Sequence, residues 1–274
     1  MPPDVITFHK MLNGCMQEEF RYWEFFVSTY GSLAQSLVER HFVDLKEQSA
    51  KIMLESLKSV RQDDGAFLKE FSGSNEREFL VYFERKVFDV ARKHCDRKER
   101  KGDFDAAFLG NLFDKVPLVH QEVALLAMKV LPQDETNKIL RVPLALVQTG
   151  EAEVLEKWSG ILNRNVPRFP RLEDIVLQQI ESQRGSNCPT IKTFADVLDG
   201  RIVWRDKQHV ENHVSECLYC LDRETSLKEM LFYLRTLVPL SPELARGVLA
   251  NLKIPLKPSR SQSALFTKVM KVFK

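Results

Sequence analysis

Apolar residues recur at three- and four-residue steps along most of the chain, which is the spacing of one buried face of an amphipathic helix. The clearest stripes are Val27, Tyr30, Leu33, Ala34 and Leu37, then Ala50, Met53, Leu54, Leu57 and Val60, then Phe79, Phe83, Val87 and Val90. No convincing run alternates strictly between apolar and polar positions, as a half-buried strand would. The pattern therefore predicts an all-α fold.

Turn-forming and charged residues interrupt this pattern and divide the chain. We predict helix breaks at 63–65, 72–75 and 96–103, a turn at 131–135, a further break at 142–143, a proline-punctuated linker at 166–171 and a short helix over 172–182. The predicted organisation is one helical domain over 1–105, a second over 106–165, a linker over 166–185 and a C-terminal domain over 186–274.

The composition is that of a soluble globular protein, because 44% of the 274 residues are hydrophobic and 28% are charged. The formal net charge of +2 is too close to neutral to indicate nucleic-acid binding by itself. No segment reaches the roughly 18 consecutive apolar residues of a membrane span, and residues 1–4 lack the basic start and apolar core of a secretory signal. We therefore expect a cytoplasmic protein, whose five cysteines favour metal binding over disulfides.

The C-terminal domain contains a group of side chains of the kind that bind zinc. Cys217 and Cys220 are separated by two residues, which lets two thiolates bind one ion across a tight turn. His213 precedes Cys217 by one helical turn, so both are expected to project from the same helix face. The fourth ligand is Cys188 or, one turn before His213, His209. The alternative is a set of small buried cysteines beside an unrelated histidine.

This region resembles the zinc-containing anti-sigma domain. The resemblance covers about 186–240 and rests on Cys188-Pro189, on Val197-Leu198-Asp199-Gly200-Arg201-Ile202 and on the closing pattern His213-x-x-x-Cys217-x-x-Cys220. It implies a zinc ion (Zn2+) held by Cys188, His213, Cys217 and Cys220, with Cys188 preferred over His209. It also implies binding to a sigma factor, in which the helix from Arg223 to Leu237 contacts the partner.

The zinc has two possible roles under this resemblance. In some relatives of that domain, oxidation joins ligand cysteines, ejects the zinc and releases the sigma factor. A zinc-bound thiolate is nucleophilic enough for this chemistry. The alternative is a structural zinc that only holds the helices together.

The preceding two-thirds of the chain resembles the two helical domains of an extracytoplasmic-function sigma factor. Residues 20–101 are similar to the domain that binds polymerase core and melts promoters, through Phe20-x-x-Trp23-x-x-Phe26-Val27-x-x-Tyr30 and Phe79-Leu80-x-x-Phe83-x-x-Lys86-Val87-x-Asp89-x-Ala91-Arg92. Residues 112–162 are similar to the second domain, a helix-turn-helix, and this likeness begins with Val116-Pro117-Leu118-Val119-His120. The resemblance implies that the domains over 1–105 and 106–165 are sigma-like and precede a zinc domain over 186–274.

Two features depart from the sigma-factor pattern. The acidic stretch through which that family contacts polymerase corresponds to 46–51, where Lys51 replaces the last acid and is expected to weaken a charge-complementary contact. The DNA-reading helix, expected over 144–155, has no Lys or Arg before Lys157, although such helices need groups that meet phosphates and base edges. It carries instead Gln148, Thr149, Glu151, Glu153 and, just beyond, Glu156.

Two basic segments are candidates for contacts with partners. The first is a candidate nucleic-acid site, or else a solvated charged face, and comprises Arg92, Lys93, Arg97, Lys98, Arg100 and Lys101. The second is the tail over 251–274, which has no acidic residue and an apolar stripe at Leu265, Phe266, Val269, Met270 and Phe273. This basic helical tail is expected to pack on the chain itself, with docking to a partner or to an anionic membrane surface as alternatives.

These features lead us to expect a non-catalytic transcription regulator, in which the zinc domain contacts the sigma-like domains within one chain and controls their access to polymerase or DNA. The sequence has no glycine-rich phosphate loop and no nucleophile motif. Four protein ligands would also leave no open position on a catalytic zinc. The expected partner is RNA polymerase core or another regulatory protein, with DNA as a further candidate. The alternative is a protein–protein adaptor that has lost polymerase and promoter binding.

Overall fold

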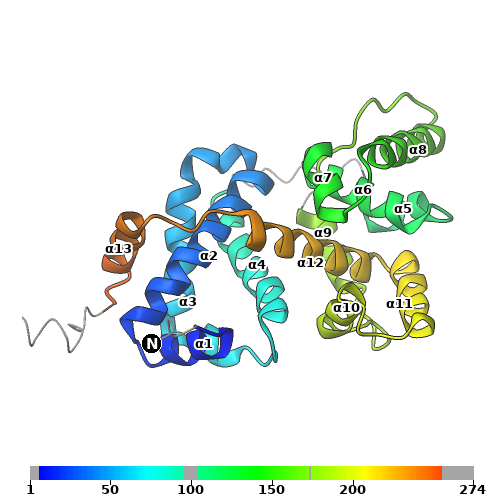
Figure 1. Cartoon of the computed structure of the whole chain (residues 1–274). Coiled ribbons are helices and arrows are strands. Elements are labelled where there is room, and N and C mark those ends of the chain that lie inside the picture. The colour runs from blue at the N-terminus through cyan, green and yellow to red at the C-terminus, as the bar shows by residue number, and fades with distance from the viewer. Residues whose placement is uncertain (1–5, 96–103, 173, 255–274) are drawn as a thin grey trace, which may run out of the picture.

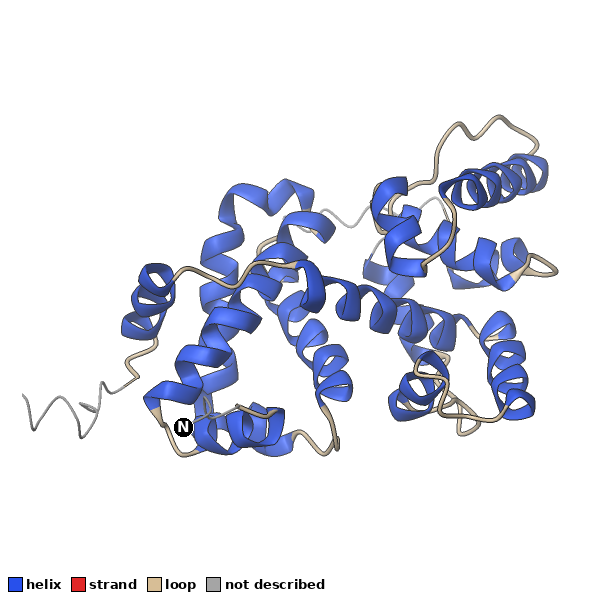
Figure 2. Cartoon of the chain, in the orientation of Figure 1, coloured by secondary structure: helices blue, strands red, loops and turns tan. Residues whose placement is uncertain are grey.

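The computed structural model describes residues 6–95, 104–172 and 174–254, and Figure 2 shows only helices and connecting loops among them. The all-α prediction is therefore confirmed. The helices are α1 (Phe8–Met16), α2 (Phe20–His41), the 3-10 helix η1 (Val43–Gln48), α3 (Ser49–Glu70), α4 (Glu76–Arg92), α5 (Ala106–Phe113), α6 (Leu118–Met128), α7 (Gln133–Leu140), α8 (Leu144–Leu162), α9 (Asp174–Ser182), α10 (Ile191–Leu198), α11 (Trp204–Glu216), α12 (Leu218–Thr236) and α13 (Pro242–Asn251). None of these helices is long and apolar enough to cross a membrane.

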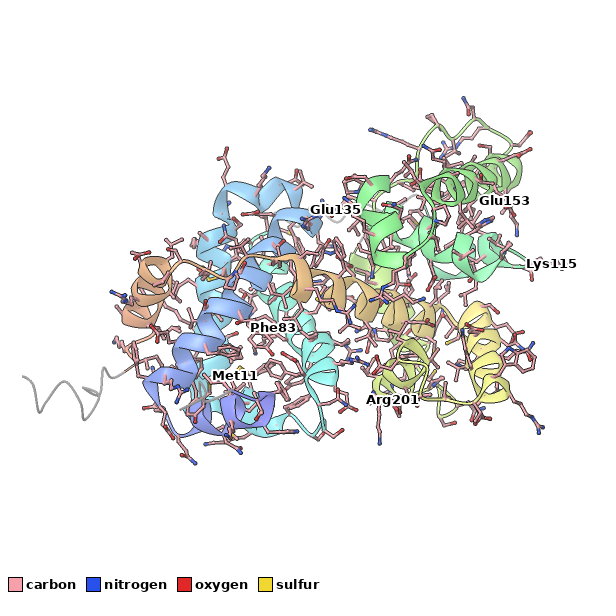
Figure 3. The ribbon with its side chains drawn as sticks, in the orientation of Figure 1. Met11, Phe83, Lys115, Glu135, Glu153 and Arg201 are labelled. Atoms are coloured by element: carbon pink, nitrogen blue, oxygen red, sulfur yellow. The ribbon has the colours of Figure 1, made fainter. Side chains whose placement is uncertain are left out.

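Helices α1 to α4 form a first bundle around an aromatic core. Phe26 and Tyr30 of α2 stack with their ring centroids 4.7 Å apart. Both rings meet Phe83 of α4 at centroid distances of 6.0 and 5.6 Å, and Phe83 is labelled inside this bundle in Figure 3. The apolar stripe predicted from Val27 to Leu37 is buried in the same core, so the three- and four-residue period did identify the inner face of α2.

The helix breaks predicted in the first bundle have different outcomes. The break at 72–75 is present, because the Asn75 side chain caps α4 by accepting hydrogen bonds from the N–H groups of Arg77 and Glu78 at 3.0 and 3.1 Å. The break at 63–65 is wrong, since α3 continues to Glu70. Gly65 has a φ of +74°, which glycine adopts without steric cost, so the turn-forming residue lies at a local irregularity inside the helix. The break at 96–103 lies outside the described residues.

Helices α5 to α8 form a second bundle. The break predicted at 142–143 separates α7 from α8, whereas the turn predicted at 131–135 is only partly present, because α7 begins at Gln133. Arg141 ends α7 with a left-handed φ of 57°. Helix α6 approaches α8 closely at Gly150, where a Cβ atom would lie 2.9 Å from the ring of His120. Helix α8 contains the whole expected DNA-reading segment 144–155 and ends at Leu162.

Helices α9, α10 and α11 lie beside the second bundle and share its apolar core. Trp158 of α8, Val176 of α9, Phe194 of α10 and Val214 of α11 belong to one buried cluster. The short helix predicted over 172–182 is α9, so the segment 166–185 is partly helical. The N–H of Leu172 donates to the carbonyl oxygen of Met128 at 2.8 Å, which attaches this segment to α6.

Helix α13 was not predicted. Its start has a recognisable pattern, because Pro242 occupies the first turn and the Ser241 side chain accepts a hydrogen bond from the N–H of Leu244. The segment before it is attached to α2, since the N–H of Leu240 donates to the carbonyl oxygen of Ser28 at 2.9 Å. The apolar stripe predicted in the tail lies outside the described residues.

Helix α12 crosses the middle of the molecule between the two bundles (Figure 1). It contacts α4 of the first bundle, α6 and α7 of the second, and α9 to α11. Leu221 and Leu227, in its first half, belong to the core of the second bundle. Met230 and Tyr233, in its second half, belong to the core of the first. One helix therefore completes both apolar cores.

Charged side chains of α12 are buried and paired with the bundles. Asp222 lies 2.8 Å from the ammonium group of Lys129, which directly follows α6, and 2.6 Å from the guanidinium of Arg223. Glu229 lies 2.6 Å from Nε2 of His41 on α2. Removing one member of a buried pair is strongly destabilising because the other charge is left without a partner. These pairs therefore fix the position of α12 against α6 and α2.

The pKa values of these carboxyl groups follow from burial and from the neighbouring cations. Burial alone would raise the pKa of Asp222, but Lys129 and Arg223 outweigh it and hold that pKa well below its ordinary value. Burial also acts to raise the pKa of Glu229, and His41 outweighs it and lowers that pKa. Both carboxylates therefore stabilise the fold only while they are ionised.

We predict that His41→Leu lowers the free energy of unfolding by about 3 kcal/mol or more, because it leaves Glu229 buried without its partner. The double variant His41→Leu/Glu229→Leu should lie within about 2 kcal/mol of the parent, since an apolar pair can replace a buried ionic pair. Urea unfolding of the parent, both single variants and the double variant measures the coupling energy. If the two single effects simply add, the pair does not hold α12 to α2.

We predict that Asp222→Asn lowers the free energy of unfolding more at neutral pH than at acidic pH. A carboxyl group whose pKa is lowered by folding stabilises the protein above its unfolded pKa of about 3.9, and this stabilisation is lost as the pH falls through the folded pKa. The variant should therefore be less stable than the parent at pH 7, and the difference should shrink below about pH 4. Urea unfolding of both proteins across this range tests it; a difference independent of pH would contradict it.

Candidate metal centre

Four side chains from three parts of the C-terminal domain meet in one cluster. Cys188 lies in the loop between α9 and α10, His213 in the last turn of α11, Cys217 between α11 and α12, and Cys220 in the first turn of α12. One potential ligand atom from each lies within 4.8 Å of all the others. This group of three cysteines and one histidine can hold a metal ion.

The backbone between α11 and α12 sets the directions of two of the ligands. Helix α11 ends at Glu216, and Cys217 has an extended conformation with φ −123° and ψ 106° before α12 begins. The expectation that His213 and Cys217 project from one helix face is therefore wrong. The bend brings them together instead, and it places Cys217 and Cys220 around the N-terminus of a new helix.

The distance between two of the sulfur atoms suits a shared metal ion. The Sγ atoms of Cys188 and Cys217 are 3.9 Å apart, far beyond the about 2.05 Å of a disulfide. Two thiolates on one tetrahedral zinc, with Zn–S bonds of about 2.3 Å, are about 3.8 Å apart. The N–H of Gly185 also donates to Sγ of Cys188 at 3.3 Å, which orients this sulfur from the outer side.

One ring nitrogen of His213 makes no hydrogen bond within the described structure. This atom is Nε2, and it is buried. A buried polar atom left unpaired is unfavourable, and a neutral imidazole nitrogen is a common metal ligand. A metal ion bound by the three cysteines would satisfy this atom.

A cation at this position would also reverse the electrostatics of the most buried thiol. Burial and the neighbouring thiols of Cys188 and Cys217 raise the pKa of Cys220, which favours its neutral form. A coordinated metal ion has the opposite effect, because it deprotonates the thiols that bind it. The N-terminus of α12 adds to this, since the first N–H groups of a helix carry partial positive charge.

The competing ligand candidate, His209, lies apart from this group. It is exposed on α11 and does not belong to the cluster. The geometry therefore agrees with the ligand set that includes Cys188.

The basic residues predicted to bind nucleic acid are only partly within the described structure. Arg92 ends α4, lies 3.1 Å from Asp89 and sits over the ring of Phe88, so it is engaged within the chain. Lys93 is exposed directly after α4. The other four residues lie outside the described ranges, and they are Arg97, Lys98, Arg100 and Lys101.

Comparison with known proteins adds no assignment to this geometry. No family model, no curated protein and no solved structure matches the chain.

We predict that the purified chain binds one equivalent of a divalent metal ion and that removing it by chelation abolishes cooperative unfolding of the C-terminal domain, because such ligands assemble only in the folded state. Cys188→Ser and Cys217→Ser should each weaken metal binding by more than about 100-fold. Changing residues that only contact the ligands already weakens metal binding by up to about 100-fold, and loss of a ligand should cost more. His209→Gln is the matched control and should bind like the parent. Elemental analysis measures the metal content, and competition with a chelating dye measures the metal affinity. Full metal content in Cys188→Ser would show that Cys188 is not a ligand.

Proposed function

We propose that this protein is a non-catalytic transcription regulator, in which a zinc-binding anti-sigma-like domain is docked on two sigma-like helical domains of the same chain. The observation that carries the proposal is the position of α12. The helix that would contact the partner in an anti-sigma domain here lies between α4 of the first bundle and α6 and α7 of the second. This position of α12 supports the proposed intramolecular contact.

The contacts outside α12 also support docking of one folded unit on another. Arg77 of α4 makes a bidentate contact with Asp199, after α10, at 2.5 and 2.6 Å. Arg85 of α4 lies 2.7 Å from Glu181 of α9. Interfaces between domains are more polar than domain cores, and these exposed ion pairs have that character.

Zinc is the metal that best fits the proposed centre. Three cysteines and one histidine are a donor set of structural zinc sites, and soft thiolates disfavour magnesium and calcium. All four positions of a tetrahedral ion would be taken by protein ligands. The metal would therefore join the loop before α10, the end of α11 and the start of α12 into one rigid unit.

The docked arrangement leaves the proposed polymerase-contact stretch open. Lys46, Glu47 and Lys51 are exposed around the start of α3. Control would therefore act by holding the two bundles in one fixed arrangement through α12, rather than by burying this stretch.

The acidic residues of α8 carry less weight against DNA binding than their number suggests. Glu151 accepts a hydrogen bond from Gln133 at 2.5 Å, and Glu153 lies 2.7 Å from Nδ1 of His120 (Figure 3 labels Glu153 on α8). Both are thus engaged within the bundle. The exposed positions at its start include Gln148 and Thr149 but no cation, which is the specific observation that favours the adaptor as the second candidate.

We predict that loosening the docked domain increases binding of bacterial-type core RNA polymerase. Arg77→Asp places two acids face to face at Asp199 and should raise the amount of polymerase captured by the immobilised full chain several-fold, because like charges at an interface are destabilising. The exchange variant Arg77→Asp/Asp199→Arg restores opposite charges and should return to the parent level. Hydrogen exchange of α12 amides reports, in the same samples, whether docking has changed.

The outcomes of this experiment separate the two candidates. Polymerase captured by neither the parent nor either variant, while α12 exchange does increase in Arg77→Asp, would reject the sigma-like role and leave the adaptor. Equal capture by all three proteins would retain polymerase binding and reject control by the docked domain.

A further inference from the structure

A cavity of about 270 Å³ lies at the seam where α12 meets α4, α6 and α9. Glu84 and Phe88 line it from α4, Lys129 follows α6, Leu177 and Glu181 belong to α9, and Arg223 belongs to α12. The walls therefore come from the first bundle, the second bundle and the C-terminal domain together. The volume is near the lower end of the range of small-molecule sites.

Two charged side chains in this cavity have buried atoms without a partner. Glu84 is 3% exposed, and its Oε1 makes no hydrogen bond within the described structure. Arg223 is 9% exposed, and its Nε and Nη1 are likewise unpaired. Buried polar groups are rarely left in this state, so each such group calls for a bound water, ion or ligand.

The pairing of the neighbouring groups shows which atoms remain available. Arg223 uses Nη2 for its contacts with Asp222 at 2.6 Å and Glu181 at 3.5 Å, which leaves the N–H groups of Nε and Nη1 without an acceptor. Lys129 is already engaged by Asp222 at 2.8 Å and by Ser226 at 3.1 Å. Burial raises the pKa of Glu84 in spite of Lys129 and Arg223, as expected of a carboxyl group without a direct cationic partner.

The open atoms define the chemistry of a complementary ligand. Nε and Nη1 of Arg223 are charge-bearing donors on different edges of the guanidinium, and a carboxylate oxygen is an acceptor of matching charge for one of them. Oε1 of Glu84 needs a donor, and an ammonium group supplies one with the matching charge. As many acidic as basic residues line the cavity, so a ligand without net charge fits best. Phe88 and Leu177 add an apolar wall.

We propose that this cavity binds a free α-amino acid, with its carboxylate on Arg223 and its ammonium group on Glu84. The amino acid would touch α4 and α12 at once and would strengthen their contact, because a ligand that binds only the docked form stabilises that form. If the proposed function holds, the amino acid would act as a signal that keeps the zinc-binding domain docked. Binding itself does not depend on that function.

The test uses the full metal-loaded chain and each standard L-amino acid as a probe, with thermal shift for screening and calorimetry for affinity. At least one amino acid should bind with a one-to-one stoichiometry. The corresponding amine without a carboxylate and the corresponding acid without an amine should each bind at least about 10-fold more weakly, since each loses a charge-assisted hydrogen bond.

Variants locate the binding in the cavity. Glu84→Gln keeps the shape of the side chain and removes its charge, so it should fold and weaken amino-acid binding at least about 10-fold. Glu156→Gln on the exposed face of α8 is the matched control and should bind like the parent. A circular dichroism melt confirms that both variants are folded.

Three binding results would each overturn the proposal. They are no binding by any amino acid, unchanged affinity in Glu84→Gln, and equal affinity for the amine or the acid alone. Ordered water in the cavity of a crystal soaked with the amino acids would lead to the same conclusion. Because these measurements contain no polymerase, their failure is distinct from failure of the proposed function.

Discussion

The burial of a charged helix between two bundles is the constraint on which the rest of this structure depends. Helix α12 carries Asp222, Arg223 and Glu229 into the protein interior, where each needs a partner. Asp222 pairs with Lys129, which directly follows α6, and Glu229 pairs with His41 of α2, so these two partners belong to different bundles. Arg223 pairs with Asp222 and with Glu181 of α9. Because its apolar residues also complete both cores, α12 sets the arrangement of the bundles as well as its own position. We therefore regard the docked state as part of the fold rather than as an addition to two finished domains.

Sequence reasoning succeeded where the information is local and failed where it is not. The period of α2 reveals its buried face, and the spacing of His213, Cys217 and Cys220 identifies a candidate metal site, because each pattern lies within a few residues. The chain has no glycine or proline at the bend between α11 and α12, so no turn-forming residue indicates the break at Cys217. The contact between Lys129 and Ser226 joins residues 97 positions apart, and a helix buried among charges has the same mixed pattern as a solvated one.

The structure also changes how the departures from the sigma-factor pattern should be interpreted. Two of the three acids noted on α8, Glu151 and Glu153, make contacts with α7 and α6. Their presence is explained by packing of the second bundle, whatever its partner. The charge change at Lys51 has no such internal explanation, because this residue is exposed. Lys51 is therefore a stronger argument for an altered partner than the acids on α8 are.

The candidate metal centre and the cavity are physically connected through the first turns of α12. Cys220 and Arg223 are three residues apart, which places them on the same side of the helix. The guanidinium of Arg223 also lies 5.8 Å from the ring of Tyr219, the neighbour of Cys220. A metal ion that orders the N-terminus of α12 therefore also orders the arginine that faces the cavity. Since binding free energies are reciprocal, a ligand held by Arg223 must in turn favour the metal-bound form, and the two sites would stabilise one docked state together.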